Sequence, residues 1–253
     1  MTLSVEALVI DIPKRSPEPL TVTMNTGQVW GVLGPNGVGK TTLLHTLAGL
    51  KMPRKGRLRL NDADLSSIHR MSLAQQVGIM FQDHQDGFPA TVMETALLGR
   101  FPHLSPWEME TEQDIKIAQH SIDRLELSSL AGRSVTQLSG GERQRVALAS
   151  LLTQNPNIWL VDEPTNHLDL HHQVAVMSLL QEKARETKLV VMSLHDVNLA
   201  ARWCSHVILQ YPDRPALVGS AENLLTLENL EPLYQQKLVR GEIAGRLVFM
   251  PSI

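Results

Sequence analysis

The sequence has almost no cysteine, no long apolar run and no excess of basic charge. Cys204 is the only cysteine among 253 residues, so no disulfide framework can form within one chain, which fits a reducing compartment. No apolar run is long enough to span a bilayer, and residues 1–6 lack the basic region and apolar core of a secretory signal. The net charge of −3 argues against a nucleic-acid-binding surface. We therefore expect a soluble chain with no nucleic-acid partner, which can still dock onto a membrane protein.

The sequence does contain enough apolar material for a sizeable core. Hydrophobic residues make up 43% of the chain, which suits one large globular domain or two smaller units. Short apolar runs between turn residues predict strands over residues 3–10, 21–23, 29–33, 57–60, 77–81, 158–161, 189–192, 207–210 and 248–250. Helical spacing predicts helices over residues 43–49, 64–76, 170–185, 197–203 and 222–234. The alternation of strands and helices indicates an α/β fold.

The block between residues 91 and 152 has helical periodicity and no convincing strand. Ile115, Ala118, Ile122 and Leu125 are spaced to fall on one face of a helix. We interpret this block as a helical insertion in an otherwise α/β chain.

A glycine-rich loop lies between the apolar run 29–33 and the helix that follows it. Its spacing is G-x-x-x-x-G-K-T, which is the phosphate-binding pattern in the strand–turn–helix context that supports it. Backbone N–H groups of such a loop point at one centre, and the helix N-terminus adds its positive dipole end. A chance glycine loop is the alternative. The candidate phosphate-binding residues are Gly34, Pro35, Asn36, Gly37, Val38, Gly39, Lys40, Thr41 and Thr42.

Two carboxylates follow the apolar run 158–161 directly. Open α/β sheets bind ligands at the carboxyl ends of their strands, so Asp162 and Glu163 are expected beside the phosphate loop. Asp162 suits the shell of a Mg²⁺ ion, and Glu163 suits the polarisation of a water molecule. A solvated acidic pair at a strand end is the alternative.

A second anion-binding helix start is indicated by Ser139, Gly140 and Gly141. A serine followed by glycines at the start of a helical run favours a helix N-terminus with free N–H groups. The chain thus carries two phosphate-type helix starts, more than one nucleotide needs. An ordinary serine cap with a glycine turn is the alternative.

These motifs together resemble those of ABC-type ATPases. The loop 34–42 resembles their Walker A motif, 158–163 their Walker B motif with its glutamate, and 138–142 their signature motif, with glutamate where glutamine is common. Gln82 resembles the Q-loop glutamine, 166–169 the D-loop and 193–196 the switch histidine segment. The resemblance implies a P-loop NTPase of ABC type with a mixed sheet core. It implies one domain over 1–253, with a RecA-like core at about 1–82 and 155–253 and a helical subdomain at about 83–154.

The resemblance also implies a mechanism with ATP and Mg²⁺ as cofactors. Thr41, Gln82 and Asp162 are expected at the metal, while Glu163, His195 and Gln82 are expected to act in hydrolysis. Two copies of the chain would pair head to tail, so that Ser139, Gly140 and Gly141 complete the partner's nucleotide site. A satisfied core histidine is the alternative for His195.

One departure from the family concerns adenine. An aromatic residue usually stacks on the base from about two dozen positions before the Walker A motif, but this zone contains Ile10 and Ile12 instead. Trp30 is the first aromatic residue and lies inside a predicted strand. Stacking contributes about 1–3 kcal/mol per base. We therefore expect modest ATP affinity, with Ile10 or Ile12 in apolar contact with adenine or with looser packing of the base.

Within the family, the chain resembles the separate ATPase subunits of bacterial importers. The segment 91–103 is similar to that of metal-chelate importers for iron–siderophores, haem and cobalamin, and the missing aromatic residue favours cobalamin. The expected partners are integral membrane permease subunits, contacted through residues 83–110, and a periplasmic substrate-binding protein. The chain would then lie on the cytoplasmic face of the inner membrane. A soluble non-transport ABC ATPase and a small-molecule kinase remain as alternatives.

Overall fold

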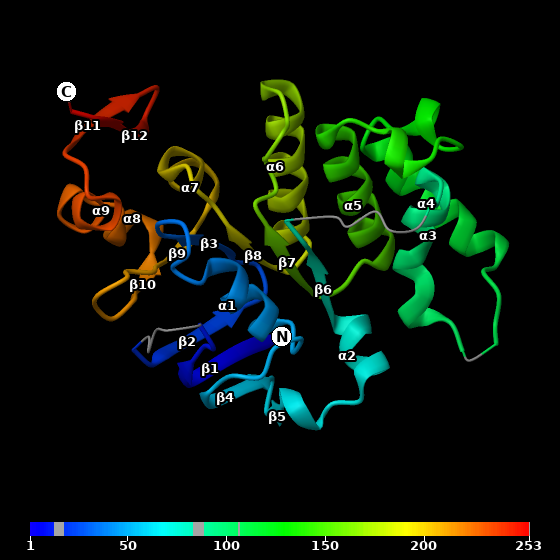
Figure 1. Cartoon of the computed structure of the whole chain (residues 1–253), viewed down its shortest axis with the longest axis horizontal. Coiled ribbons are helices and arrows are strands. Elements are labelled where there is room, and N and C mark those ends of the chain that lie inside the picture. The colour runs from blue at the N-terminus through cyan, green and yellow to red at the C-terminus, as the bar shows by residue number, and fades with distance from the viewer. Residues whose placement is uncertain (13–17, 83–88, 106, 253) are drawn as a thin grey trace.

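The computed structural model of the protein describes residues 1–12, 18–82, 89–105 and 107–252. Its framework consists of two sheets and a small hairpin (Figure 1). The first sheet is antiparallel, in the order β2 (Leu20–Asn25), β1 (Thr2–Val9), β4 (Lys55–Leu60) and β5 (Ala63–Asp64). The second sheet runs in the order β10 (Leu217–Ser220), β9 (His206–Leu209), β3 (Val29–Leu33), β8 (Leu189–Ser193), β7 (Ile158–Asp162) and β6 (Val77–Met80).

The second sheet is parallel except at one edge, where β10 pairs antiparallel with β9. Strands β3, β7 and β8 are buried along their whole length, as expected for parallel strands covered on both faces. Asp162 lies opposite Ser193, and Ser193 lies opposite Val32. The loops after these three strands therefore leave the sheet at the same edge. The expected mixed-sheet α/β fold is confirmed.

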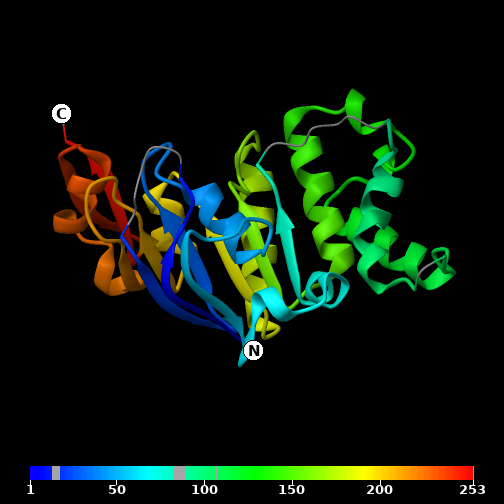
Figure 2. The same cartoon turned by 60° about the horizontal axis from the view of Figure 1, so that its bottom comes forward.

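Two hydrophobic cores lie on opposite faces of this sheet, because neighbouring side chains of each strand point to opposite sides. On one face, Trp30 and Leu160 pack with α1 (Lys40–Leu47) and the antiparallel sheet. On the other face, Leu33 and Trp159 pack with α6 (Leu170–Arg185) and the helical segment. Figure 2 shows the layers from a second direction.

The remaining helices follow the chain in order. After β5 come the short 3₁₀ turn η1 (Leu65–Ser67) and α2 (Arg70–Gln76). Between β6 and β7 lie α3 (Val92–Leu97), η2 (Leu98–His103), α4 (Glu112–Arg124), η3 (Ser128–Leu130), η4 (Val135–Gln137) and α5 (Gly140–Gln154). After β8 and β10 come α7 (Val197–Trp203), α8 (Ala221–Leu224) and α9 (Leu227–Tyr234), followed by the hairpin of β11 (Leu238–Ile243) and β12 (Arg246–Pro251).

The block 91–152 is helical in its described residues, apart from one isolated bridge between Thr91 and Ser134. It lies beside the six-stranded sheet, to the right in Figure 1. On the predicted helix face, Ala118, Ile122 and Leu125 are buried, whereas Ile115 in the first turn is 45% exposed. Asp114 takes the inward position in the first turn of α4, where it pairs with Arg100.

Other differences from the sequence expectations have local causes. Strands β10 and β11 were not predicted, because β10 is short and β11 carries Arg240 and Glu242 in place of an apolar run. The turn at Ala244 and Gly245, both with positive φ, closes β11 onto β12. Phe81 lies outside β6, and its ring meets His45 edge-on.

The Asp114–Arg100 ion pair provides a test of how the helical segment is held together. The Asp114 carboxylate accepts from Thr111 Oγ1, from Thr111 N and from Arg100 Nε, the last at 2.7 Å. Hydrogen bonds from Thr111, followed by the one from Arg100, lower the pKa of Asp114 from 3.8 to about 2.

We predict that Asp114→Ala lowers the free energy of unfolding by about 3 kcal/mol at pH 7, because it leaves Arg100 without its carboxylate. Since the folded pKa lies below the unfolded one, this stabilisation is full above pH 3.8 and is lost as the pH falls toward 2. Urea unfolding of the variant at several pH values measures both effects. Glu112→Ala, an exposed carboxylate in the same helical turn, is the control. Equal losses in the two variants would contradict this role of Asp114.

Candidate functional site

The glycine-rich loop connects β3 to α1 at the edge where the parallel strands end. Gly39 precedes α1 with φ of 109°, a left-handed conformation that favours glycine, and no side chain caps the helix start. A Cβ at Gly39 would overlap the side chain of Ile12. The loop backbone can therefore take this shape only with glycine here, and the first-turn N–H groups of α1 are left for a ligand.

Lys40 lies inside this loop and is only 6% exposed. Its ammonium donates to the carbonyl of Gly34 at 2.9 Å and to that of Pro35 at 3.4 Å. Burial lowers the pKa of Lys40, while the nearby charges of Glu163 and Asp162 act in the opposite direction. A buried cation opposite two carboxylates, at a helix N-terminus, is suited to bind a polyphosphate.

Glu163 is the meeting point of several loops. Its carboxylate accepts from Gln82 Nε2 at 2.9 Å and also from the side chains of Asn166 and His195. Its backbone has φ of 50°, which is uncommon for a residue other than glycine and typical of functional sites. This unusual backbone conformation occurs directly after β7, at the residue whose carboxylate the three donors reach.

The backbone of Glu163 is held as firmly as its side chain. Its N–H donates to Ser193 Oγ at the end of β8, at 2.9 Å. Its carbonyl accepts from Gln144 Nε2 of α5, also at 2.9 Å. Gln144 is 5% exposed, so this bond is buried and connects α5 of the helical segment to the carboxyl edge of the sheet.

Asp162 ends β7 and is completely buried. One of its oxygens, Oδ1, accepts from Ser193 Oγ, whereas Oδ2 has no hydrogen-bond partner among the described residues. A buried carboxylate oxygen without a donor fits a hydrated cation. No group of three or more His, Cys, Asp or Glu side chains that could hold a metal ion occurs in the described residues.

A cavity of about 630 Å³ collects these groups. Of the predicted metal and hydrolytic residues, it brings together Thr41, Gln82, Glu163 and His195 beside Lys40, while Asp162 lies beneath them. Its lining residues are Ile12, Asn36, Gly37, Gly39, Lys40, Thr41, Thr42, Gln82, Glu163, Asn166 and His195. Ile12 reaches this cavity and Ile10 does not, while Trp30 is 2% exposed in the core, as its strand position predicts.

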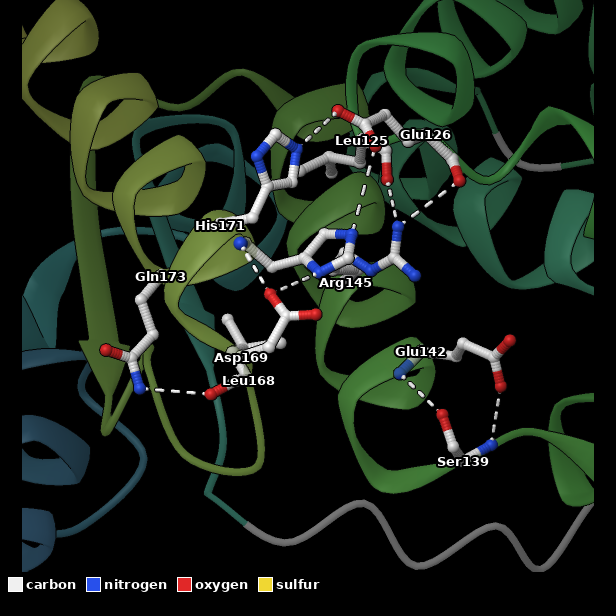
Figure 3. A network of polar contacts seen from close by, with 10 residues as sticks. Leu125, Glu126, Ser139, Glu142, Arg145, Leu168, Asp169, His171 and Gln173 are labelled. Atoms are coloured by element: carbon white, nitrogen blue, oxygen red, sulfur yellow. Dashed lines mark hydrogen bonds and ion pairs between the residues drawn. The ribbon is translucent and has the colours of Figure 1, made fainter.

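Ser139, Gly140 and Gly141 do not line this cavity. Ser139 is exposed and caps α5 in a reciprocal pair with Glu142, in which Ser139 N donates to Glu142 Oε2 at 2.7 Å and Glu142 N donates to Ser139 Oγ at 3.3 Å (Figure 3). A Cβ at Gly141 would lie 2.8 Å from the carbonyl oxygen of His167, so glycine is needed for this close approach. Ser139 therefore acts as an ordinary serine cap of α5, as the alternative interpretation expected. The completion of a partner's nucleotide site by Ser139, Gly140 and Gly141 stays a prediction.

Helix α5 is also hydrogen-bonded to the residues that follow α4. Arg145 donates to the carbonyls of Leu125 and Glu126, which follow α4, and Glu126 contacts His171 at the start of α6 (Figure 3). These bonds join the helix that begins at Ser139 to the neighbouring helices. The position of Ser139 relative to the cavity is therefore set by several elements.

Sequence reasoning missed three residues that shape the site. Gln144, Ser193 and Asn166 each donate a hydrogen bond to, or accept one from, Glu163 or Asp162. Asn166 and Ser193 lie in the segments that resemble the D-loop and the switch histidine segment, whereas Gln144 lies in no predicted site segment. The available signal for Gln144 was a glutamine at the start of the buried stripe of α5, which continues with Leu148 and Leu151.

Comparison with known proteins identifies relatives over most of the chain. Residues 18–166 match the model of the ABC transporter family. The hemin import ATP-binding protein of Pseudomonas aeruginosa is 38% identical over 222 residues, covering 86% of each chain. The ferric enterobactin transport ATP-binding protein of Escherichia coli is 33% identical, covering 92% of this chain and 88% of that protein. The cobalamin import ATP-binding protein of Halobacterium salinarum is 32% identical, covering 95% of this chain but only 61% of that longer protein.

Solved structures show the same fold. An inward-facing ABC transporter assigned to the metal-chelate type superposes with a TM-score of 0.86 at 29% identity, covering 100% of this chain and 98% of that one. The dimeric structure of a bacterial ABC transporter cassette gives a TM-score of 0.75 at 25% identity, covering 87% of this chain and 98% of that one.

We predict that Glu163→Gln lowers the rate of ATP hydrolysis by about 10²–10⁴-fold, because the amide cannot accept a proton from water. The amide still fills the space between Gln82, Asn166 and His195, so ATP should bind and accumulate in a dimer. Phosphate release and size-exclusion chromatography with ATP measure the two effects. Glu186→Gln, an exposed carboxylate beyond α6, is the control. Normal hydrolysis by Glu163→Gln would show that Glu163 is not the base.

Proposed function

The chain belongs to the ABC transporter family, and from this premise we propose that it is the ATP-hydrolysing subunit of an importer for metal chelates. The observation that carries the proposal is the convergence of Gln82, Asn166 and His195 on the Glu163 carboxylate, beside the phosphate loop. Binding of phosphate alone does not require a carboxylate held in place by three side chains. Hydrolysis requires a positioned carboxylate, because the attacking water molecule must lose a proton.

We assign the roles of the site residues as follows. Lys40 and the loop N–H groups of residues 34–42 bind the β- and γ-phosphates. Glu163 accepts a proton from the attacking water, and His195 orients the γ-phosphate and the water. Water then replaces ADP on the γ-phosphorus, which gives ADP and inorganic phosphate.

Mg²⁺ belongs to this proposal as the second cofactor. Thr41, Gln82 and Asp162 would hold it, and the ion neutralises charge on the phosphates when bound. The buried Asp162 Oδ2 without a donor supports this assignment. Ser193 Oγ holds Asp162 from the other side and keeps the carboxylate in place.

The site is proposed to be completed by a second copy of the chain. Ser139, Gly140 and Gly141 form a helix start outside the cavity of their own chain. The Ser139 N–H is taken by Glu142, so the N–H groups of Gly140 and Gly141 are the ones proposed to bind a phosphate. A related cassette is known as a dimer. A head-to-tail pair explains why one chain carries two anion-binding helix starts.

The proposed cargo is a metal chelate, and no particular metal chelate is proposed. The three relatives are named for hemin, ferric enterobactin and cobalamin, so the expectation of cobalamin in particular gains no preference. The relatives are import proteins, which also disfavours the alternative of a non-transport ATPase.

The proposed partners are permease subunits in the membrane and, for an importer of this kind, a periplasmic substrate-binding protein. None of the helices in the described residues could cross a bilayer.

The proposed surface for the permease includes exposed apolar side chains of the helical segment. Leu98 is 65%, Phe101 64% and Met109 81% exposed. The expected surface covered residues 83–110, of which 83–88 and 106 lie outside the described residues. A partner that covers these side chains would remove apolar area from water.

We predict that a tagged chain purified from detergent-solubilised membranes of its source cells brings down a polytopic membrane protein. Phe101→Ser should weaken this association several-fold, because it removes an exposed apolar contact. Ile243→Ser, at an equally exposed position on the C-terminal hairpin, is the control. Quantitative mass spectrometry measures the recovered partner. Recovery of soluble partners alone would contradict the importer assignment.

A further inference from the structure

A second cavity, of about 260 Å³, adjoins the phosphate cavity and shares Ile12 with it. It lies between the antiparallel sheet and the segment that follows β9. A molecule bound through its phosphates at residues 34–42 can therefore extend past Ile12 into this second space. Its lining residues are Leu8, Ile10, Ile12, Glu18, Leu20, Val38, Leu43, Gln210, Tyr211, Pro212, Asp213, Arg214 and Ala216.

Gln210 is the buried polar side chain of this cavity. It follows β9 directly, and its backbone N–H donates to the carbonyl of Leu33 at 2.8 Å, immediately before the phosphate loop. The residue is 8% exposed, and its Oε1 is buried without a hydrogen-bond donor among the described residues. A buried amide oxygen without a partner is costly, so a ligand that supplies a donor would be favoured.

The walls of the cavity suit a flat heterocycle. Ile10, Ile12 and Leu20 provide apolar side chains on one side. On the other side, Tyr211 is held by its hydroxyl, which donates to the carbonyl of Asn229 at 2.8 Å. The guanidinium of Arg214 lies 4.1 Å from the centre of the Tyr211 ring, which gives a planar charged surface at the mouth. The volume is below the range of about 300–1,000 Å³ typical of sites for drug-sized ligands, as expected for a single base.

A glutamine carboxamide matches adenine in its hydrogen-bonding groups. Its oxygen accepts from the 6-amino group, and its NH₂ donates to a neighbouring ring nitrogen. The last torsion of a glutamine side chain is soft, so the carboxamide of Gln210 can turn toward the cavity at little cost. On the edge formed by position 6 and N7, adenine offers a donor and an acceptor, whereas hypoxanthine and guanine offer two acceptors and leave the glutamine oxygen without a donor.

We propose that Gln210 selects adenine, by accepting a hydrogen bond from the 6-amino group of a nucleotide whose phosphates lie in the glycine-rich loop. This inference rests on the proposed ATPase function and adds the determinant of base specificity. It places the base against the apolar side chains of Ile10, Ile12 and Leu20, with Gln210 as its buried hydrogen-bonding partner, in a chain that lacks the usual stacking aromatic residue.

The test compares ATP with ITP, which differs at position 6 of the base. We expect the purified full chain to show a KM for ATP that is roughly 2- to 10-fold lower than that for ITP, the usual effect of one hydrogen bond. Gln210→Leu should raise the KM for ATP to that for ITP. Gln210→Glu keeps an acceptor and should keep the preference for ATP, which provides a second reading should the leucine variant fold poorly. Gln119→Leu, on α4, is the control for a loss of glutamine elsewhere.

Equal KM values for the two nucleotides in the wild-type chain would overturn the inference. A Gln210→Leu variant that retains the full preference for ATP would also overturn it. In both cases hydrolysis itself would still be observed, and the proposed function would stand. Failure of the wild-type chain to hydrolyse any triphosphate would instead overturn the proposed function, and this inference with it.

Discussion

The carboxylate of Glu163 accepts hydrogen bonds from three side chains that come from three different loops. Gln82 follows β6, Asn166 follows β7, and His195 follows β8. They meet because β6, β7 and β8 are parallel neighbours in the sheet and end at one edge. A shift of any one loop would change the surroundings of Glu163. If Glu163 is the base, as proposed, the rate of hydrolysis depends on the position of each loop.

The same residue links hydrolysis to the helical segment. Gln144 of α5 donates to the carbonyl of Glu163, and α5 begins at the Ser139 cap. The helix that is proposed to reach the partner's phosphates is thus bonded to the base of its own site. Arg145 bonds α5 to the carbonyls of Leu125 and Glu126 after α4, so a chain of hydrogen bonds links the helical segment to Glu163. Through these hydrogen bonds, a permease that contacts the helical segment could affect the position of Glu163 and thus ATP hydrolysis.

Much of this arrangement could be predicted from the sequence, because the main motifs consist of adjacent residues. Lys40, Asp162 and Glu163 each lie within one short pattern whose strand and helix context was recognisable. Gln144 and Gln210 could not be predicted in the same way, since Gln144 bonds a residue 19 positions away and Gln210 lines a cavity between the antiparallel sheet and the segment after β9. Strand β11 escaped prediction for a related reason, because backbone pairing with β12 and not an apolar pattern defines it.

The central claim is that a complete nucleotide site needs two copies of the chain. Mixed dimers carrying Lys40→Ala and Ser139→Arg test it most directly, by measuring ATP hydrolysis with the two changes in separate copies or in the same copy. The head-to-tail account predicts that changes in separate copies damage one shared site and leave the other intact, so hydrolysis persists. Both changes in one copy damage both sites, so hydrolysis is lost. The reverse pattern would show that each chain forms its own site.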